Sequence, residues 1–255
     1  MTKSFWDHLD ELRSVLIRCV VAWGICAVAA FCFRDALFAF IFAPARPDFI
    51  TYRVLKNLST FNSQLLSTLN PQLSTISFIN TQLAAQFTVH MQVAALAGFV
   101  IAFPYLLYQF YGFISPALYN NEKRAATCII GFGTILFISG AVLNYLVIFP
   151  FAFQFLATYQ VQPEVVNQIA LESYISTLLI LSLLMGILFE MPLVAWALGK
   201  AGLLQAAWLK RYRRHAIVFL MITAAVITPT GDAFTLLLVT LPLYLLYELS
   251  IRMVK

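Results

Sequence analysis

Residues 108–124 read YQFYGFISPALYNNEKR and join two long apolar runs of the chain. Ser115-Pro116 predicts the end of the preceding helix, because proline lacks an N–H and disfavours helical dihedral angles at the residue before it. The Asn-Asn pair that follows favours a turn, and Glu122 opens the next helix. The segment is therefore either a recognition surface with one acidic contact, or an interfacial aromatic belt beside a solvated loop.

The composition indicates a membrane protein. Of the 255 residues 62% are hydrophobic and 11% are charged, and the mean hydropathy is +0.86. This leaves too little polar surface for a soluble globule of the same length. Backbone polar groups in a bilayer must be satisfied internally, and no alternation of period two appears, so the sequence predicts an all-α integral membrane protein. We interpret the net charge of +5 as a signal of membrane orientation and expect no nucleic acid partner.

The apolar runs predict six membrane-spanning helices in one polytopic domain. We place them at about 14–33, 85–113, 125–149, 171–198, 215–228 and 233–249. The third is expected to stop at Pro150, and residues 1–13 form an amphipathic helix along the membrane surface. The fifth run makes only about 20 Å of helix, short of the roughly 30 Å hydrocarbon layer. The last two runs therefore cross a thinned membrane or form a hairpin that does not fully cross, which would leave four spans.

The polar segment 34–84 and the placement of the basic residues predict the orientation. The segment 34–84 suggests an external cap made of short helices or a hairpin. On its side of the membrane lie four Lys and Arg residues, whereas eleven lie on the opposite side. By the positive-inside rule both termini are cytoplasmic.

Glu190, two residues before Pro192, is the most unusual residue of the spans. A carboxylate at this depth faces a bundle interior, a partner or a water-filled cavity, or it is protonated and bonded to a neighbouring helix or to backbone freed by the proline. A proton- or ion-coupled solute transporter that titrates Glu190 is one hypothesis. The absence of an evident repeat and of further ionisable midplane groups argues against it. No motif for hydrolysis, nucleotide binding or metal ligation appears, so no enzyme, cofactor or metal ion is expected.

Two further carboxylates lie near the predicted cytoplasmic interface. Glu11 and Glu122 could together receive guanidinium groups through bidentate, charge-assisted hydrogen bonds. Alternatively, Arg13 and Arg124 neutralise them as local ion pairs. Spacing alone does not separate the two interpretations.

Several motifs recur in a characteristic order along the chain. They are His8-Leu9-Asp10-Glu11-Leu12-Arg13, Tyr108-Gln109 through Phe113, Pro116-Ala117-Leu118-Tyr119, Glu122-Lys123-Arg124, Phe149-Pro150-Phe151-Ala152-Phe153, Phe189-Glu190 with Pro192, and Thr228-Pro229 with Asp232. In this combination the chain resembles the TatC family, the multispanning receptor subunit of the twin-arginine protein translocase. The resemblance covers the chain except the loop from Pro47 to Leu83.

The resemblance implies a curved, glove-like bundle of six helices, with short fifth and sixth helices and both termini in the cytoplasm, in the bacterial inner membrane. It also implies a receptor that binds twin-arginine signal peptides of folded precursors. Small single-span TatA/TatB-type subunits would assemble on the bundle for export driven by the proton-motive force. Self-association in a larger complex is implied as well.

The resemblance also assigns roles to single residues. Glu11 and Glu122 would face the paired arginines, and Glu190 matches an intramembrane glutamate on the concave face. The signal-peptide patch would be shaped by Arg13, Phe113, Pro116, Leu118, Tyr119 and Arg124. Partner-contact or structural positions would be Pro44, Thr228 and Asp232. The chain departs from the family pattern at Gln92, where lysine is frequent, at Leu236, where a polar residue is, and at Ala225, where a larger side chain is.

Overall fold

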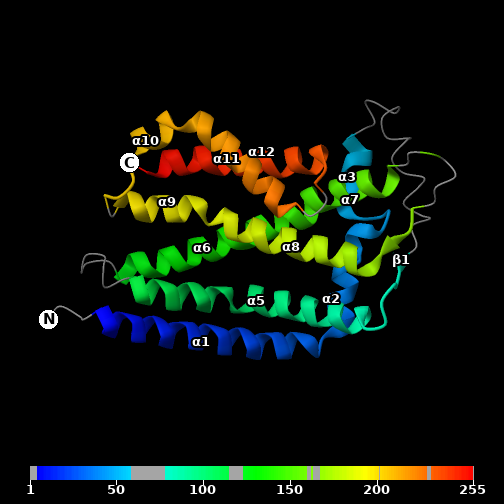
Figure 1. The fold of residues 1–255 in the computed structure, drawn as a ribbon, viewed down its shortest axis with the longest axis horizontal. Coiled ribbons are helices and arrows are strands. Elements are labelled where there is room, and N and C mark those ends of the chain that lie inside the picture. Colours follow the sequence, from blue (N-terminus) through cyan, green and yellow to red (C-terminus); the bar gives the residue numbers. More distant parts are fainter. Residues whose placement is uncertain are drawn as a thin grey trace.

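The computed structural model describes residues 5–58, 78–114, 123–159, 162, 167–200, 202–228 and 231–254. Its long helices lie side by side, and the first helix begins at the same end of the molecule at which the last one finishes (Figure 1). The elements are α1 (Phe5–Phe31), α2 (Arg34–Ile41), the 3-10 turn η1 (Ala43–Ala45), α3 (Ile50–Leu58), β1 (Phe78–Ile79), α5 (Ala85–Ile114), α6 (Lys123–Leu143), the π-helical turn η5 (Asn144–Ile148), α7 (Phe149–Thr158), β2 (Ile169–Ala170), α8 (Leu171–Phe189), α9 (Met191–Lys200), α10 (Ala206–Arg211), α11 (Arg213–Ile227) and α12 (Ala233–Met253).

Five helical segments in the described ranges are long and apolar enough to cross a membrane: Leu9–Phe31, Ala85–Phe113, Ile130–Thr158, Leu171–Lys200 and Ala233–Met253. Helix α11 has 15 residues, or about 22 Å of helix, which agrees with the short fifth helix expected from the sequence. Helix α12 is longer than predicted. It continues past Leu249 to Met253, with Arg252 in its last turn, and has 21 residues in all.

The N-terminal segment differs from the prediction. Residues 5–13 do not form a separate surface helix, because α1 is one continuous helix of 27 residues from Phe5 to Phe31. No proline or glycine lies between Phe5 and Trp23 to interrupt it. Glu11 and Arg13 therefore belong to the same continuous helix as the membrane-spanning residues that follow.

The third long helix also continues beyond its predicted end. Pro150 lies in the first turn of α7, directly after the π-helical turn η5, and the helix runs on to Thr158. Proline has no N–H to donate to the carbonyl four residues earlier, Leu146. That carbonyl accepts a hydrogen bond from the Thr51 hydroxyl on α3 instead. A partner distant in sequence thus replaces the missing bond and lets the helix continue.

Glycines allow the main helix pairs to approach closely. A Cβ on Gly98 of α5 would lie 2.4 Å from the backbone nitrogen of Ala27 on α1. A Cβ on Gly140 of α6 would lie 2.6 Å from the Met185 carbonyl oxygen, and one on Gly186 of α8 would lie 2.5 Å from the Phe137 ring. Because lipid provides no hydrophobic drive between helices, such close contacts are the main source of attraction.

The described part of the polar segment after α1 forms the short helices α2 and α3 at the ends of the long helices, while β1 pairs in parallel with β2 from beyond α7. Three tyrosine hydroxyls fasten this cap. Tyr52 donates to the Pro150 carbonyl at 3.0 Å, Tyr145 to Phe40 at 2.6 Å and Tyr174 to Ile41 at 2.9 Å. Burial raises the pKa of Tyr52, so its hydroxyl remains a donor. Four phenylalanine rings surround Tyr174: Phe42, Phe78, Phe149 and Phe153.

Candidate functional site

The fourth predicted span is interrupted at Glu190. Helix α8 ends at Phe189, and α9 begins at Met191. The Glu190 N–H donates to the Ile187 carbonyl at 3.1 Å, which tightens the last turn. Pro192 follows in the first turn of α9, where its missing N–H is tolerated. The sequence Glu-Met-Pro therefore produces a break, and the carboxylate stands at it.

The Glu190 carboxyl group is buried between helices. Both of its oxygens are out of contact with solvent and have no hydrogen-bond partner among the described residues. A Cβ on Gly133 of α6 would lie 3.1 Å from Glu190 Oε2, and it would also press against Leu107 of α5 and Leu193 of α9. The missing side chain at Gly133 thus leaves the space that the carboxyl group occupies. A buried carboxyl group without a partner inside a membrane protein is typical of a functional position.

An apolar groove runs along α8 toward this position. It has a volume of about 450 Å³, and Gln92 and Ser176 are its polar lining residues. The other lining residues are Trp23, Ala95, Leu96, Phe99, Leu179, Ile180, Leu183 and Ile187. Trp23 of α1 donates its ring N–H to the Ala95 carbonyl of α5 at 2.8 Å, which fixes one wall. The groove reaches Ile187, three residues before Glu190.

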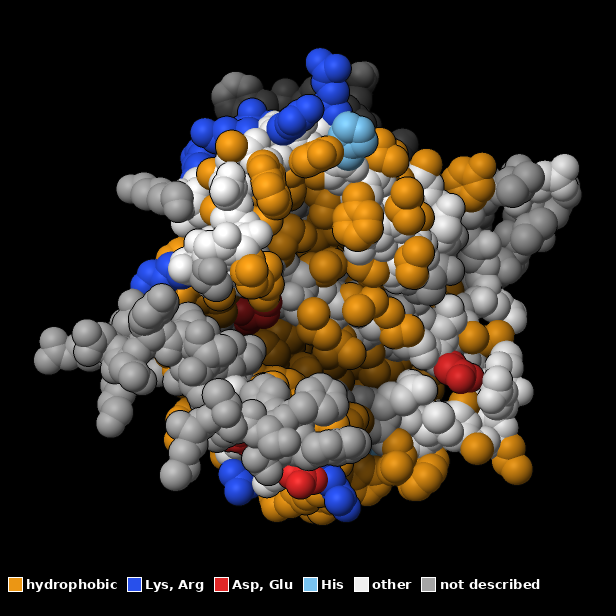
Figure 2. All heavy atoms as spheres, turned by 60° about the vertical axis from the view of Figure 1, so that its left-hand side comes forward, with side chains coloured by type: hydrophobic (Ala, Val, Ile, Leu, Met, Phe, Trp, Pro, Cys, Tyr) orange, Lys and Arg blue, Asp and Glu red, His pale blue; other side chains and the backbone are white. Residues whose placement is uncertain are grey.

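Figure 2 shows how hydrophobic and basic side chains are distributed over one face of the molecule. Hydrophobic side chains line a hollowed face of the molecule, and Lys and Arg side chains gather at its upper edge, over α10 and α11. An apolar hollow beside a basic edge matches the two zones of a membrane, the hydrocarbon layer and the headgroup level.

A second part of the predicted site lies where α1 begins and α5 ends. Val15 of α1 belongs to a buried cluster against which Phe113 of α5 packs. Glu11 lies one turn before Val15 and is half-buried, and Arg13 is exposed. The structure therefore brings the predicted residues of α1 beside Phe113, at the point where α5 leads into the segment 115–122.

Some predicted residues of this patch fall outside the part of the chain that the structure describes. Pro116, Leu118, Tyr119 and Glu122 lie outside the described residues. Arg124 lies in the first turn of α6, and only its backbone is described. The proximity of Glu11 and Glu122 thus remains a prediction.

Comparisons with known proteins match this arrangement. A family model described as Sec-independent protein translocase protein (TatC) matches residues 7–242. The chain belongs to the TatC family. It is 36% identical over 248 residues to the TatC protein of Blattabacterium sp. subsp. Periplaneta americana, with 97% of this chain and 93% of that protein covered. The TatC protein of Aquifex aeolicus is 34% identical over 250 residues, with 98% and 93% covered.

Solved structures agree with the sequence comparisons. The crystal structure titled twin arginine translocase receptor TatC in DDM superposes with a TM-score of 0.78 at 32% identity, covering 97% of this chain and 99% of that chain. A second crystal structure of the TatC receptor gives a TM-score of 0.76 at 32% identity, covering 96% and 97%. These matches confirm the predicted all-α membrane fold. The chain is a multi-pass component of the twin-arginine protein translocase that works with other Tat subunits, and it is not an enzyme.

Three positions singled out by the TatC resemblance make local contacts. Pro44 is buried in the cap, and its carbonyl accepts from the Tyr52 hydroxyl at 3.3 Å. Thr228 ends α11 with its hydroxyl bonded to the Ala224 carbonyl at 2.9 Å. Asp232 caps α12, because its Oδ1 accepts from the Thr235 N–H at 2.7 Å.

Polar residues inside the bundle were missed by sequence reasoning about this TatC chain. Asn144 is fully buried in the π-helical turn, and its side-chain nitrogen donates to the Ser182 hydroxyl of α8 at 2.8 Å. Gln92 was noted as a departure from the family pattern, yet it lines the groove with Ser176. Asn144, Ser182 and Gln92 each stand between two apolar neighbours, a signal that identifies a buried site only when the facing helix is known.

Proposed function

We propose that this TatC family member is the receptor subunit that binds twin-arginine signal peptides of folded precursors. Its termini face the cytoplasm, as the distribution of Lys and Arg indicates. The observation that carries the proposal is the antiparallel pairing of α1 and α5 (Figure 1), which sets Glu11 one turn from Val15, a member of the buried cluster against which Phe113 packs. A relative of the same fold is titled a twin arginine translocase receptor.

The chemistry of the site favours arginine over lysine. Glu11 and Glu122 together present two carboxylates, and a guanidinium group offers a planar fork of donors that fits a carboxylate in bidentate fashion. A lysine ammonium is a strongly hydrated point charge and forms no such fork. Two adjacent arginines would therefore bind two carboxylates better than two lysines would.

The groove along α8 supplies the place for the apolar part of a signal peptide. From Ser176 to Ile187 the groove follows about 16 Å of helix, and its lining is almost entirely apolar. An apolar peptide segment that lies in this groove approaches Glu190 at its far end. The end of such a segment would lie near Ile187, three residues from the buried carboxyl group of Glu190.

The outward face of α11 suits the small single-span subunits. Three large apolar side chains at four-residue spacing are exposed on it, Val218, Ile222 and Val226, with 57%, 58% and 81% of their surface accessible. A partner helix that packs on this stripe would cover it. In this proposal Thr228 and Asp232 hold the turn between α11 and α12 and set the angle of the stripe.

Site-specific photocrosslinking tests the receptor. A photoreactive residue at Phe113 is combined with a signal peptide that carries Arg-Arg or Lys-Lys, in membranes. We expect crosslinking to the Arg-Arg peptide alone, and its loss when Glu11→Ala is combined with Glu122→Ala. Asp7→Ala with Asp10→Ala removes the same charge from the same end of α1 and should preserve the preference. Equal crosslinking of the two peptides would refute the receptor assignment.

The path of the apolar segment is tested separately. A photoreactive residue at Leu183, inside the groove, should crosslink to the apolar part of the bound signal peptide. The matched control is Ile101 on α5, which does not line the groove and is 62% exposed. Crosslinking that is as strong from Ile101 as from Leu183 would exclude the groove as the binding path.

A further inference from the structure

A second cavity lies at the end of the molecule where the chain terminates. It has a volume of about 500 Å³ and opens between α10, α11 and α12. Three cationic side chains line it, Lys210, Arg213 and Arg252, against one carboxylate, Glu248. The cavity therefore has an excess of positive charge.

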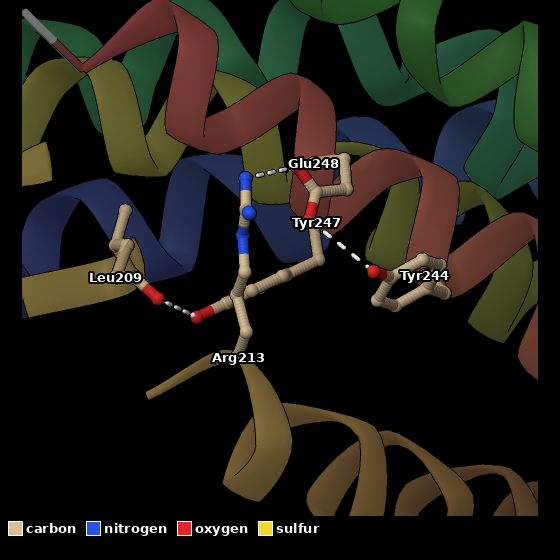
Figure 3. Close-up of polar contacts among 5 residues, drawn as sticks. All are labelled: Leu209, Arg213, Tyr244, Tyr247 and Glu248. Carbon is tan, nitrogen blue, oxygen red and sulfur yellow. Dashed lines mark hydrogen bonds and ion pairs between the residues drawn. The ribbon is translucent and has the colours of Figure 1, made fainter. Parts of the chain in front are cut away.

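A network of hydrogen bonds fixes the wall of this cavity (Figure 3). Arg213 donates to Glu248 Oε2 at 2.8 Å, and the Tyr244 hydroxyl donates to Oε1 of the same carboxylate at 3.3 Å. The Tyr247 hydroxyl donates to the Leu209 carbonyl at 2.8 Å, which ties α10 to α12. Both oxygens of Glu248 are therefore engaged, and the charge of Arg213 is compensated.

The other two cations are left to bind something else. Lys210 and Arg252 form no ion pair with a carboxylate among the described residues. Both side chains belong to exposed residues on different helices that border the same cavity. An anionic group that enters the cavity would reach both of them.

The surroundings of the two cations resemble a membrane interface. Trp208 and Tyr212 flank Lys210 along the chain and are 56% and 54% exposed, as aromatic residues at the headgroup level are. On α12 the exposed residues Leu241, Leu245 and Leu249 follow one another at four-residue spacing. Arg252 continues this stripe after three more residues. A ligand whose charged group binds Arg252 can therefore lay an apolar chain along the exposed leucines of α12.

We propose that this cavity binds the phosphodiester of an anionic phospholipid, such as phosphatidylglycerol or cardiolipin. Lys210 and Arg252 contact the phosphate, and an acyl chain lies along the leucine stripe of α12. Inorganic phosphate and an acidic peptide share the charge but have no acyl chain for that stripe, so the lipid fits the whole surface. Basic cavities between membrane helices bind such headgroups on the cytoplasmic side. The binding site goes beyond the proposed receptor function and does not rest on it.

Native mass spectrometry of the full chain in detergent tests the site. Phosphatidylglycerol is titrated against phosphatidylethanolamine and against inorganic phosphate. We expect retention of phosphatidylglycerol that is roughly tenfold weaker in the Lys210→Gln, Arg252→Gln variant. Arg211→Gln with Arg214→Gln removes the same charge from α10 and α11 outside the cavity and should change retention less than about twofold.

Each result decides the proposal. Equal losses in the two double variants would mean diffuse attraction and overturn the site. Equal binding of phosphatidylglycerol and phosphatidylethanolamine would show that the cavity does not select an anionic lipid. Full competition by inorganic phosphate would show that the cavity binds a free anion and not a lipid. Leu245→Gln keeps every charge and should still weaken phosphatidylglycerol retention, while Ile135→Gln on α6, a position that is 64% exposed and outside this stripe, should not. This pair keeps the test decisive if a charge variant fails to fold.

Discussion

The two ends of the molecule are held together differently. At the end that carries α2, α3 and the β1–β2 pair, hydroxyl groups from three tyrosines bind carbonyls that lie far away in sequence, and four phenylalanine rings surround Tyr174. At the opposite end, the start of α1 and the end of α5 contact each other mainly through apolar packing around Val15 and Phe113. The first end is held by directional bonds between distant segments, whereas the contact of α1 with α5 is held mainly by apolar packing.

This difference has a physical purpose in the proposed receptor. A hydrogen bond or aromatic contact inside the protein fixes the angle between two helices, because it is favourable only over a small range of distances and angles. Tyr174 lies two residues before Ser176, so fixing Tyr174 in the cap also fixes the start of α8 and of the groove that this helix lines. The predictions below test this division.

The largest effect on stability is expected in the cap. Tyr174→Ala removes a ring that is 3% exposed, and should cost about 3 to 5 kcal/mol of folding free energy. Tyr174→Phe keeps the ring and loses only the bond to Ile41, about 1 kcal/mol. Thermal unfolding in detergent measures both. Tyr108→Ala, at an exposed position near the other end, is the control, and an equally large loss there would contradict the division.

An intermediate effect on stability is expected at the contact between α6 and α8, which lies between the cap and Glu190. Gly186→Ala would put a Cβ 2.5 Å from the Phe137 ring, which should cost about 1 to 3 kcal/mol. Gly131→Ala on α6 meets no atom within 4 Å, so it should be neutral or slightly stabilising. Unfolding temperatures of the two variants compare them directly. Equal temperatures would show that α6 and α8 are not tightly packed.

The smallest effect on stability is expected at the receptor end. Arg13 is exposed, so Arg13→Gln should change the folding free energy by no more than about 0.5 kcal/mol. In the proposed patch the same variant should weaken binding of the Arg-Arg signal peptide several-fold. Peptide affinity and unfolding temperature measured on one preparation separate the two effects. A lowered unfolding temperature with unchanged peptide affinity would mean that Arg13 stabilises the fold and does not contribute to the signal-peptide patch.

Most of the fold could be predicted from local sequence. The long apolar runs predicted the membrane-spanning helices, because length and hydropathy act along a single segment. The errors in the helices concerned where they end or break, and they include the fourth predicted span, which is interrupted at Glu190. The sequence predicted a stop at Pro150, because the Thr51 hydroxyl that binds the Leu146 carbonyl comes from a segment about a hundred residues away. It also predicted a surface helix before residue 14, which is instead the first part of α1.

The candidate site divides in the same way. Glu190 beside Pro192 could be identified from the sequence, because a carboxylate in an apolar run is costly wherever the helix packs. Only the tertiary structure decided that Gly133 makes room for the carboxyl group, that Gln92 and Ser176 share a groove, and that Lys210 and Arg252 border one cavity. Those neighbours come from different helices, and their proximity depends on how the helices pack, which no single stretch of sequence specifies.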